Sequence, residues 1–312
     1  MRVLIVGGNG FIGSHLKDAF LSNGLEVSVL DRQVERYRPP LENVRVVLGD
    51  LADPVLAQRS LNNTEAVIYC ASTTTPQTSA DEPVNDITEN LIPFLRFLNL
   101  ARHQRVRRFI FLSSGGTVYG VANTLPVSEE HPTNPFVSHG IVKLAMEKYL
   151  LTLARTGDME VVILRVGNAY GERQNPFGGF GAIATFLGCV AMQQNIVLWG
   201  DGSIVRDYIY AKDVSAACLT AVMLEDAKGV YNIGTARGYS LNDVLEVITD
   251  TTGQPMPEVH REAKRNFDVP AIVLDNKLAR QELHWKPATS LVEGVRLTWN
   301  WVCKLPRPKN SC

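Results

Sequence analysis

A histidine and a lysine stand four residues apart near the middle of the chain, at His139 and Lys143. The apolar residues around them recur at helical spacing: Ile141, Leu144, Ala145, Met146 and Leu150. Residues four apart on a helix share one face, so an imidazole would lie beside an ammonium. Such a pair is either a chance arrangement on a solvated face or a site that transfers protons.

A cluster of glycines near the N-terminus is a second candidate for chemistry. Gly8, Gly10 and Gly13 fit the pattern G-x-G-x-x-G, and Gly7 extends it to G-x-x-G-x-x-G. The cluster follows an apolar run, residues 2–6, and precedes an amphipathic pattern typical of a helix. In this context glycines let the backbone approach a pyrophosphate, and the helix N-terminus supplies N–H donors. The pattern therefore predicts a dinucleotide-binding loop.

An acidic residue, Asp31, follows the next predicted strand. A carboxylate at this place can accept hydrogen bonds from both hydroxyls of an adenosine ribose, and it would repel a 2′-phosphate. Arg32 beside it leaves some room for NADP, but the balance favours NAD as the cofactor. The alternative is that Asp31 is only a turn residue before a loop.

These residues need a scaffold, and the chain predicts one in which strands and helices alternate. Apolar runs typical of buried parallel strands occur at 2–6, 26–30, 44–49, 66–70, 107–113 and 160–166. Helical patterns lie between them at about 12–23, 54–61, 86–104 and 139–156. This alternation indicates βαβ units with right-handed crossovers, and hence a doubly wound α/β fold with a mostly parallel Rossmann sheet.

The alternation loosens beyond residue 166, where glycine and proline gather in a loop at 170–181 that would cover a site. We therefore expect an NAD-binding Rossmann domain, a smaller C-terminal α/β substrate domain and a flexible tail. The expected bounds are 1–165 plus about 205–235 for the first, 166–204 and 236–303 for the second, and 304–312 for the tail.

The composition argues against several classes of protein. Lys and Arg number 31 against 32 Asp and Glu, so no overall field would attract nucleic acid or an anionic membrane. A basic run at 102–109 fits a solvated helix end. The five cysteines are widely spaced without a C-x-x-C pair, which argues against disulfides and zinc and favours a reducing cytoplasm. The longest apolar run, 182–192, is too short to cross a bilayer.

Eight short motifs are spread over nearly the whole chain. They are GGNGFIG (7–13), GDL (49–51), CAS (70–72), SSGGTVYG (113–120), RVGNAYG (165–171), GDGSIVRDYIYAKDV (200–214), RNFDVP (265–270) and LHWKP (283–287). Together they resemble the extended short-chain dehydrogenase/reductase family, in particular its NAD-dependent nucleotide-sugar epimerase/dehydratase branch.

The resemblance implies a set of contacts to NAD. Asp50 would reach the exocyclic amine of adenine, and the turn at Cys70 would lie beside the nicotinamide ribose. Asn90 would steady the central sheet, and Lys143 would hold the nicotinamide ribose. The full implied set is Gly7, Gly10, Phe11, Ile12, Gly13, Asp31, Arg32, Asp50, Leu51, Cys70, Ala71, Ser72, Asn90 and Lys143.

The resemblance also implies that the substrate is a nucleoside diphosphate sugar, most simply a UDP-hexose. A diphosphate needs cationic or N–H contacts, and an arginine can donate two hydrogen bonds at once. The implied substrate contacts are Thr117 at the sugar, Asn168, Arg206 and Arg265 at the diphosphate, and Asp268 at the ribose. The polar run STTTPQ (72–77) follows the nicotinamide turn, and we expect it to line the sugar pocket, with Thr73 or Thr74 near the cofactor.

The family's reaction begins with oxidation at C4 of the hexose, for which a tyrosine in Tyr-x-x-x-Lys acts as the base. Lys143 matches the lysine, but His139 occupies the place of the tyrosine. An imidazole titrates near 6.5 against about 10 for a phenol, so beside Lys143 it would be mostly neutral at pH 7 and able to accept a proton. It is also shorter, and a displacement of about 1 Å can lower a rate roughly a hundredfold. We therefore expect weak activity or an altered role.

The loop at 113–120 contains a second departure. The family's serine or threonine corresponds to Gly115, and the flanking hydroxyls of Ser114 and Thr117 either replace it or only cap a strand end. The 4,6-dehydratases of the family carry an Asp-Glu pair where Gly116 and Thr117 stand. Dehydration is therefore disfavoured, while epimerisation and ketone reduction need neither carboxylate.

The sequence favours an NAD-dependent UDP-hexose 4-epimerase that acts through a transient 4-keto sugar and is weakened by His139. A nucleotide-sugar 4-keto reductase is the alternative enzyme, and a catalytically silent dinucleotide-binding protein is the alternative of another class. The leucine-rich helices at about 86–104 and 139–156 would pair in a homodimer, as in the family, or be buried within the monomer. We expect no metal, nucleic acid or membrane partner.

Overall fold

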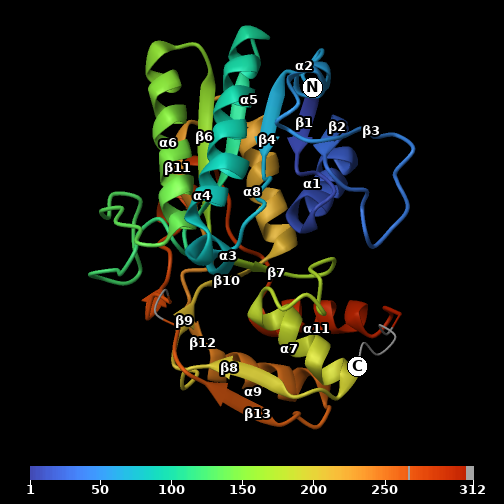
Figure 1. The fold of residues 1–312 in the computed structure, drawn as a ribbon, viewed down its shortest axis with the longest axis vertical. Helices are drawn as coiled ribbons and strands as arrows, with labels where there is room; N and C mark the ends of the chain where they lie inside the picture. The colour runs from blue at the N-terminus through green and yellow to red at the C-terminus, as the bar shows by residue number, and fades with distance from the viewer. Residues whose placement is uncertain (266–267, 307–312) are drawn as a thin grey trace.

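The computed structural model describes residues 1–265 and 268–306. Its centre is a seven-stranded parallel sheet in the order β11-β6-β5-β4-β1-β2-β3 (Figure 1). The strands are β1 (Arg2–Val6), β2 (Glu26–Asp31), β3 (Arg45–Leu48), β4 (Ala66–Tyr69), β5 (Arg108–Ser114), β6 (Glu160–Val166) and β11 (Gly229–Ile233). The strand order reverses between β1 and β4, so the predicted doubly wound fold is confirmed.

The central strands are continuous apolar runs because both faces of the sheet are covered. In β1, Val3 and Ile5 belong to one buried cluster, while Leu4 and Val6 belong to the other. Successive side chains of a strand point to opposite faces, so a strand buried on both faces has no polar alternation. The apolar run at 2–6 therefore supplies both cores of the protein.

Helices cover the two faces in separate layers. The first face is covered by α1 (Phe11–Ser22), α8 (Ala211–Met223) and α10 (Lys277–Glu282). The second is covered by α2 (Pro54–Ser60), α5 (Ile92–His103) and α6 (Ser138–Thr156). Phe20 anchors α1, and Val142 and Met146 anchor α6; all three are buried. The packing fixes which face of α6 is left for the site.

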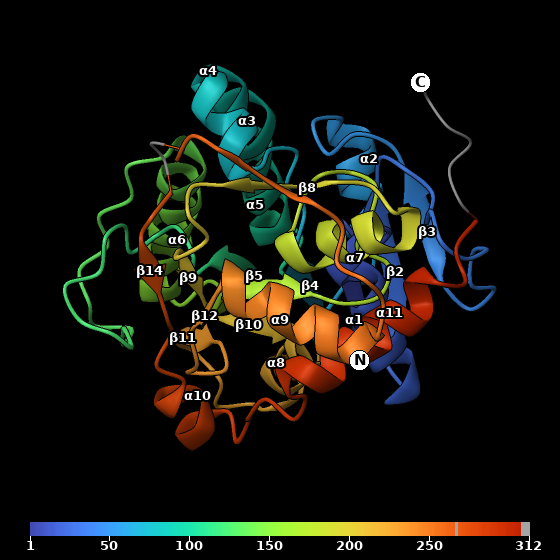
Figure 2. The same cartoon turned by 90° about the horizontal axis from the view of Figure 1, so that it is seen from below.

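A smaller part of the protein lies at the carboxyl ends of the central strands, below them in Figure 1 and towards the viewer in Figure 2. Its helices are α7 (Ala182–Met192), α9 (Leu241–Thr252) and α11 (Leu291–Val302). Its strands are β7 (Asn168–Tyr170), β8 (Ile196–Trp199), β9 (Val205–Arg206), β10 (Tyr208–Tyr210), β12 (Tyr239–Ser240), β13 (Val259–Glu262) and β14 (Ala271–Ile272). Buried Phe186, Val244 and Val295 join the three helices into one core.

The helix expected over 86–104 is present, but it begins a few residues earlier and its first part is irregular. Two short helices, α3 (Pro76–Asp81) and α4 (Pro83–Asp86), are followed by a π-helical turn, η1 (Ile87–Leu91). Pro83 and Pro93 stand in the first turns of α4 and α5. Pro83 begins the helical run, because the first N–H groups of a helix have no partner within it. The run continues without a break through η1 into α5, since Leu91 and Ile92 keep α-helical backbone angles, so Pro93 lies inside it, next to the π-helical turn.

The basic run at 102–109 is only partly a solvated helix end. Arg108 is fully buried, and its guanidinium donates hydrogen bonds to the carbonyl oxygens of Ala221 (3.0 Å) and Val222 (3.1 Å) at the end of α8. A cation there satisfies carbonyl groups that the helix leaves without partners. The expectation of a solvated end was therefore wrong for Arg108, which fastens α8 to β5.

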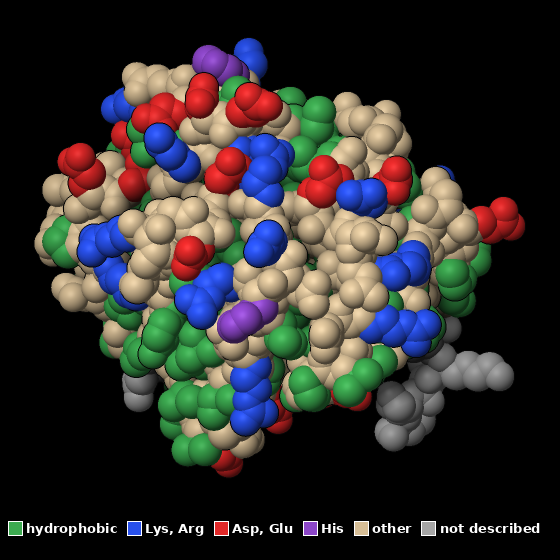
Figure 3. Space-filling model, turned by 90° about the horizontal axis from the view of Figure 1, so that it is seen from above, with side chains coloured by type: hydrophobic (Ala, Val, Ile, Leu, Met, Phe, Trp, Pro, Cys, Tyr) green, Lys and Arg blue, Asp and Glu red, His purple; other side chains and the backbone are tan. Residues whose placement is uncertain are grey.

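On the face seen in Figure 3, basic and acidic side chains are interspersed instead of gathering into one patch. Within the described ranges, none of the helices has the length and apolar character that crossing a bilayer requires. Of the tail expected at 304–312, residues 307–312 lie outside the described residues.

Candidate active site

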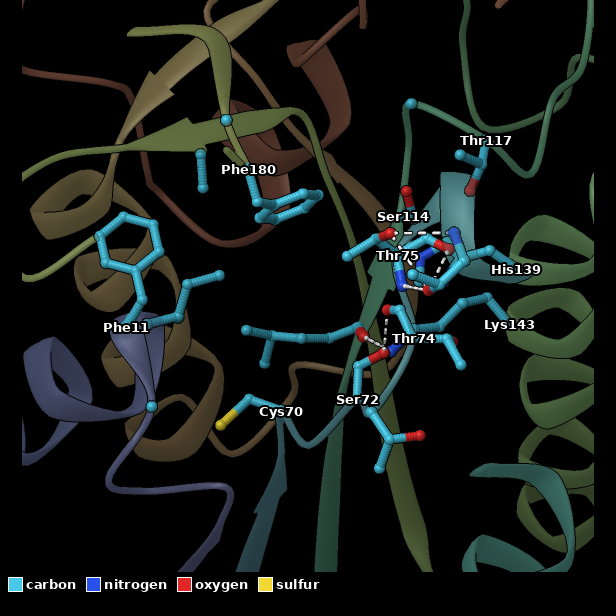
Figure 4. Close-up of a pocket in the computed structure, with 18 of the residues that line it drawn as sticks. Phe11, Cys70, Ser72, Thr74, Thr75, Ser114, Thr117, His139, Lys143 and Phe180 are labelled. Carbon is cyan, nitrogen blue, oxygen red and sulfur yellow. Dashed lines mark hydrogen bonds between the residues drawn. The ribbon is translucent and has the colours of Figure 1, made fainter. Parts of the chain in front are cut away.

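One cavity of about 1300 Å³ lies between the carboxyl ends of the central strands and the smaller part of the protein. Gly7 follows β1, Asp31 ends β2, Cys70 follows β4 and Ser114 ends β5, and all four line it. Figure 4 shows Phe11 and Phe180 on one side of this cavity and His139 and Lys143 on the other. Because parallel strands end at the same edge of a sheet, residues far apart in sequence meet there. Every catalytic, cofactor and substrate residue predicted from the sequence lines this cavity.

The glycine loop brings bare backbone to one end of the cavity. Gly7 has a φ of 86°, and a Cβ there would lie 2.8 Å from the backbone nitrogen of Ala71. A Cβ at Gly13 would lie 2.2 Å from the carbonyl oxygen of Gly7, so neither position accepts a side chain. The helix α1 begins without a side-chain cap. The N–H groups of its first turn are therefore available to an anionic ligand.

Asp31 is held at the end of β2 by the backbone around it. Its Oδ2 accepts a hydrogen bond from Asn9 N (2.9 Å), and its Oδ1 accepts one from Gln33 N (3.1 Å). A carboxylate oxygen can accept more than one hydrogen bond, so both oxygens can also receive hydroxyl groups. Arg32 lies 3.6 Å from Asp50 in an exposed ion pair, which leaves Arg32 partly neutralised. This end of the cavity therefore fits an adenosine ribose better than its 2′-phosphate.

The segment after β4 forms the floor of the cavity. The thiol of Cys70 donates to the carbonyl oxygen of Val6 (3.1 Å), and burial raises its pKa to about 12. Cys70 is therefore a neutral thiol at pH 7, and its neighbours Ala71 and Ser72 border the same space. Small side chains at these places leave room for a flat ring over the sheet edge.

His139 and Lys143 lie one turn apart on the cavity side of α6 (Figure 4). The ammonium of Lys143 is buried, donates to the carbonyl oxygen of Leu112 (3.1 Å) and lies 4.9 Å from the centre of the Phe111 ring. Burial lowers the pKa of Lys143 to about 8. Burial and the charge of Lys143 lower the pKa of His139 to about 4. At pH 7 the lysine is mostly charged and the imidazole is neutral, so the imidazole can accept a proton.

The hydroxyl of Thr117 faces the same region (Figure 4) and is buried without a hydrogen-bond partner among the described residues. An unpaired buried hydroxyl is costly unless a ligand supplies its partner. At Gly115, where the family carries a serine or threonine, a Cβ would lie 2.6 Å from a methyl carbon of Leu274. The hydroxyl at this site must therefore come from Thr117 or Ser114, both of which line the cavity.

Two arginines share one carboxylate at the far end of the cavity. Arg265 donates to Asp268 through Nε (2.9 Å), and Arg206 lies 3.6 Å from the same carboxylate. Arg206 also donates to the carbonyl oxygen of Val269 (2.7 Å), and Arg265 lies 5.7 Å from the centre of the Trp199 ring. A guanidinium group can donate two parallel hydrogen bonds to phosphate oxygens, so a pair of arginines at this end suits a diphosphate.

Asn168 lies between the two ends, at the start of β7. Its backbone N–H donates to the carbonyl oxygen of Asp207 (2.7 Å), and its side-chain oxygen lies 3.3 Å from the place of a Cβ on Gly116. The glycine therefore gives the amide of Asn168 room to face the cavity.

Residues 3–234 match the model of the NAD dependent epimerase/dehydratase family. A UDP-glucose 4-epimerase of Mycolicibacterium smegmatis is 32% identical over 306 residues, which cover 96% of this chain and 97% of the relative. The structure of Thermotoga maritima UDP-glucose 4-epimerase with UDP-glucose has a TM-score of 0.92 at 33% identity, and it covers 96% of this chain and 98% of its own. The structure of Thermus thermophilus UDP-glucose 4-epimerase with NAD has a TM-score of 0.91 at 33% identity, and the match covers 97% of this chain and 99% of that chain.

The chain belongs to the NAD-dependent epimerase/dehydratase family. It is an extended short-chain dehydrogenase/reductase of the nucleotide-sugar epimerase type, and its cofactor is NAD. The donors of the glycine loop and the carboxylate of Asp31 are the groups that this cofactor needs. Among the described residues, no group of three or more His, Cys, Asp or Glu side chains is arranged to hold a metal ion.

For this epimerase-family chain, the sequence missed a polar network beside His139. Asn90 was expected to steady the central sheet, but its contacts lie in the loop after β4: its Oδ1 accepts from Thr73 N (2.9 Å), and its Nδ2 donates to Thr74 Oγ1 (3.2 Å). The same amide donates to the buried carboxylate of Asp86 (3.0 Å). The four-residue spacing of Asp86 and Asn90 was the available signal.

The sequence also missed two polar side chains in the loop and helix that cover the cavity. Gln174 Oε1 and Thr185 Oγ1 are buried and have no hydrogen-bond partner among the described residues, and both residues line the cavity. The glycine and proline content of the loop at 170–181 predicted a cover over the site but could not identify them.

Proposed function

We propose that the protein is an NAD-dependent UDP-hexose 4-epimerase that acts through a transient 4-keto sugar and is slowed by His139. The observation that carries the proposal is one continuous cavity. It joins the glycine loop, the His139–Lys143 pair and the arginines at Arg206 and Arg265. A dinucleotide-binding protein without catalysis has no need of the last two features.

The chemistry at C4 needs a proton acceptor and a hydride acceptor. NAD, when bound, accepts the hydride and returns it. The neutral imidazole of His139 accepts the proton of the C4 hydroxyl, and Thr117, or Ser114 beside it, hydrogen-bonds the same oxygen. Lys143 holds the nicotinamide ribose and places a positive charge near the oxygen that loses its proton. Return of the proton from His139 completes the cycle.

The remainder of the substrate is held away from the reacting carbon. Arg206, Arg265 and Asn168 bind the diphosphate, and Asp268 orients the two guanidinium groups as well as the ribose. Thr73 borders the sugar. The proposed substrate contacts are divided between the two domains. The smaller domain, over 166–204 and 236–303, supplies Asn168, Arg265 and Asp268, while the Rossmann domain, over 1–165 and about 205–235, supplies Thr73, Thr117 and Arg206 together with all cofactor contacts.

The proposal is tested by restoring the tyrosine. His139→Tyr should convert UDP-glucose to UDP-galactose at least tenfold faster than the unchanged protein, because a phenol reaches farther and its ionised form is stabilised by Lys143 (about 1 Å of displacement costs roughly a hundredfold). Coupled-assay kinetics on UDP- and dTDP-hexoses provide the measurement. If the variant binds NAD but converts none of them, the epimerase proposal fails.

Two further measurements separate the alternatives. A 4-keto reductase must release its oxidised cofactor at each turnover, so NAD that stays bound through purification supports the epimerase. Calorimetry of the unchanged protein with UDP should show binding. Absence of binding would favour the silent dinucleotide-binding protein.

We also propose a cytoplasmic homodimer. Ile92 on α5 and Ile141 and Tyr149 on α6 are large apolar side chains with exposed fractions of 38%, 51% and 51%. A second copy that packs the same two helices against them would cover these side chains. Sedimentation of Ile141→Glu and of the unchanged protein tests this. The variant should be a monomer and the unchanged protein a dimer; if both proteins are dimers, the interface lies elsewhere.

A further inference from the structure

Asp86 is a buried carboxylate that joins three separate segments beside the active site. It is the last residue of α4, and only 1% of its surface is exposed. Its Oδ1 accepts hydrogen bonds from Thr74 Oγ1 (2.8 Å) and Asn90 Nδ2 (3.0 Å), and its Oδ2 accepts one from Ser138 Oγ (3.0 Å). These donors come from the loop after β4, from η1 and from the first residue of α6.

The contact to Ser138 matters because α6 lacks a cap of its own. The residue before the helix is Val137, whose side chain cannot accept a hydrogen bond. In its place, Ser79 Oγ of α3 accepts a hydrogen bond from the backbone N–H of His139 (3.1 Å), and Asp86 puts a negative charge at the same end. A negative charge at the N-terminus of a helix is favourable. The 72–90 segment thus fixes the position of His139.

Asp86 is also the carboxylate near His139 that no arginine balances. The charged and titratable groups that act on His139 and Lys143 are Asp86, Cys70 and Glu147, in addition to each other. Cys70 is a neutral thiol at pH 7, because burial raises its pKa to about 12. Glu147 forms a 2.7 Å ion pair with Arg165. Within the described ranges, Asp86 forms no ion pair with a lysine or arginine, so its negative charge is available to offset a positive charge on His139.

The histidine makes this charge important. A tyrosinate that accepts a proton becomes neutral beside Lys143. A neutral imidazole that accepts the same proton becomes a cation beside Lys143, and two like charges repel each other. An imidazole can therefore serve as the base in this family's site only if a nearby negative charge offsets the one it gains.

We propose that Asp86 is a positioning residue of the epimerase reaction, holding the first turn of α6 against the loop after β4 and offsetting the positive charge that forms on His139. The proposal rests on the proposed function, since it assigns His139 as the base. It predicts that the effect of removing the charge depends on which base is present. A purely structural role would give the same loss with either base.

The test is a double-mutant cycle of Asp86→Asn with His139→Tyr on the NAD-bound protein. With His139 present, Asp86→Asn should lower kcat roughly tenfold, because loss of the negative charge would lower the pKa of the proton-accepting imidazole by about one unit. With tyrosine present, the same change should leave kcat equal or higher, because loss of a negative charge favours the phenolate. Equal losses in both backgrounds would overturn the proposal.

A second measurement does not depend on turnover. The phenol in His139→Tyr is titrated by ultraviolet difference absorbance against the unchanged protein, with and without Asp86→Asn. Its pKa should fall when Asp86 is replaced, and an unchanged pKa would overturn the electrostatic role. If no variant converts a UDP-hexose, the proposed function fails, whereas this titration still decides the role of Asp86. Ser138→Ala is the matched control, because it removes one hydrogen bond to Asp86 and keeps the charge; its effect should be the same with either base.

Discussion

Glu147 and Arg165 form a buried ion pair beneath the active site. Arg165 Nη2 lies 2.7 Å from Glu147 Oε2, and the exposed fractions of the two side chains are 6% and 0%. Ser113 donates a hydrogen bond to the same carboxylate, and Arg165 donates to Tyr119 Oη (3.0 Å). The pair joins α6, which carries Lys143, to the ends of β5 and β6. The geometry of the cavity therefore depends on it.

Glu147→Ala should destabilise the protein by about 3–5 kcal/mol, because the buried guanidinium of Arg165 loses its countercharge. Urea unfolding followed by circular dichroism provides the measurement. Glu293→Ala is the matched control, since Glu293 pairs with Arg296 at the surface and its removal should cause no measurable change. Similar losses in both variants would contradict the importance assigned to the buried pair.

His139 should make the folded protein less stable in mild acid. Burial and Lys143 lower the pKa of its imidazole from 6.5 to about 4. Between these values the unfolded chain binds more protons than the folded one, so the free energy of unfolding falls as the pH drops from about 6.5 towards 4. The contribution of His139 to this free energy is fully present above about pH 6.5.

Urea midpoints measured across this range test the acid effect. His139→Gln should flatten the pH dependence without abolishing it, because burial lowers the pKa of His15 to about 4 as well. An unchanged slope in His139→Gln would mean that the imidazole of His139 titrates alike in the folded and unfolded chains.

Asp31→Asn should reduce the preference for NAD over NADP at least tenfold, or about 1.4 kcal/mol, because the carboxylate no longer repels a 2′-phosphate. Calorimetry with each cofactor gives the ratio of affinities. Arg32→Ala is the companion variant and should shift the ratio the other way, towards NAD. A ratio that Asp31→Asn leaves unchanged would show that Asp31 does not meet the adenosine ribose.

Thr117→Val should lower kcat/KM for a UDP-hexose roughly tenfold in the His139→Tyr background. Valine has the shape of threonine but lacks the hydroxyl that hydrogen-bonds the sugar (about 1.4 kcal/mol). Thr117→Ser keeps the hydroxyl and should retain most of the activity. NAD affinity should be the same in both. If valine is as active as threonine, Ser114 is the better candidate for the sugar contact.

Much of the fold could be predicted because its signals are local. The apolar run at 2–6 is continuous because each face of the sheet has its own core, and the chain alone displays that. The glycines at Gly7 and Gly13 are required by close backbone approaches within one loop and the next strand. Gly7, Asp31, Cys70 and Ser114 end or directly follow strands of the central sheet, so a parallel sheet had to bring them to one edge.

The segment at 76–91 could not be predicted in this way. Its prolines begin two of its short helices, but the π-helical turn that follows Asp86 and presents Asn90 has no periodicity of its own. Buried Arg108 looked like one more residue of a basic run until α8 was found to end against it. The carbonyl groups that bind Arg108 lie more than a hundred residues away in the sequence, and Asp86 is bound by residues of other segments, so neither set of partners can be recognised from neighbouring residues.

The sequence by itself determined the doubly wound sheet, the NAD loop and the residues that line the cavity, because strand periodicity, glycine spacing and the parallel topology are properties of neighbouring residues. Only the tertiary structure decided which of those residues are paired and which are left for a ligand. It placed Asp268 between two arginines, left the Thr117 hydroxyl without a hydrogen-bond partner among the described residues, and set Asp86 against the start of α6. Burial and charge depend on segments that meet only in the folded chain, and they fix the protonation state of His139.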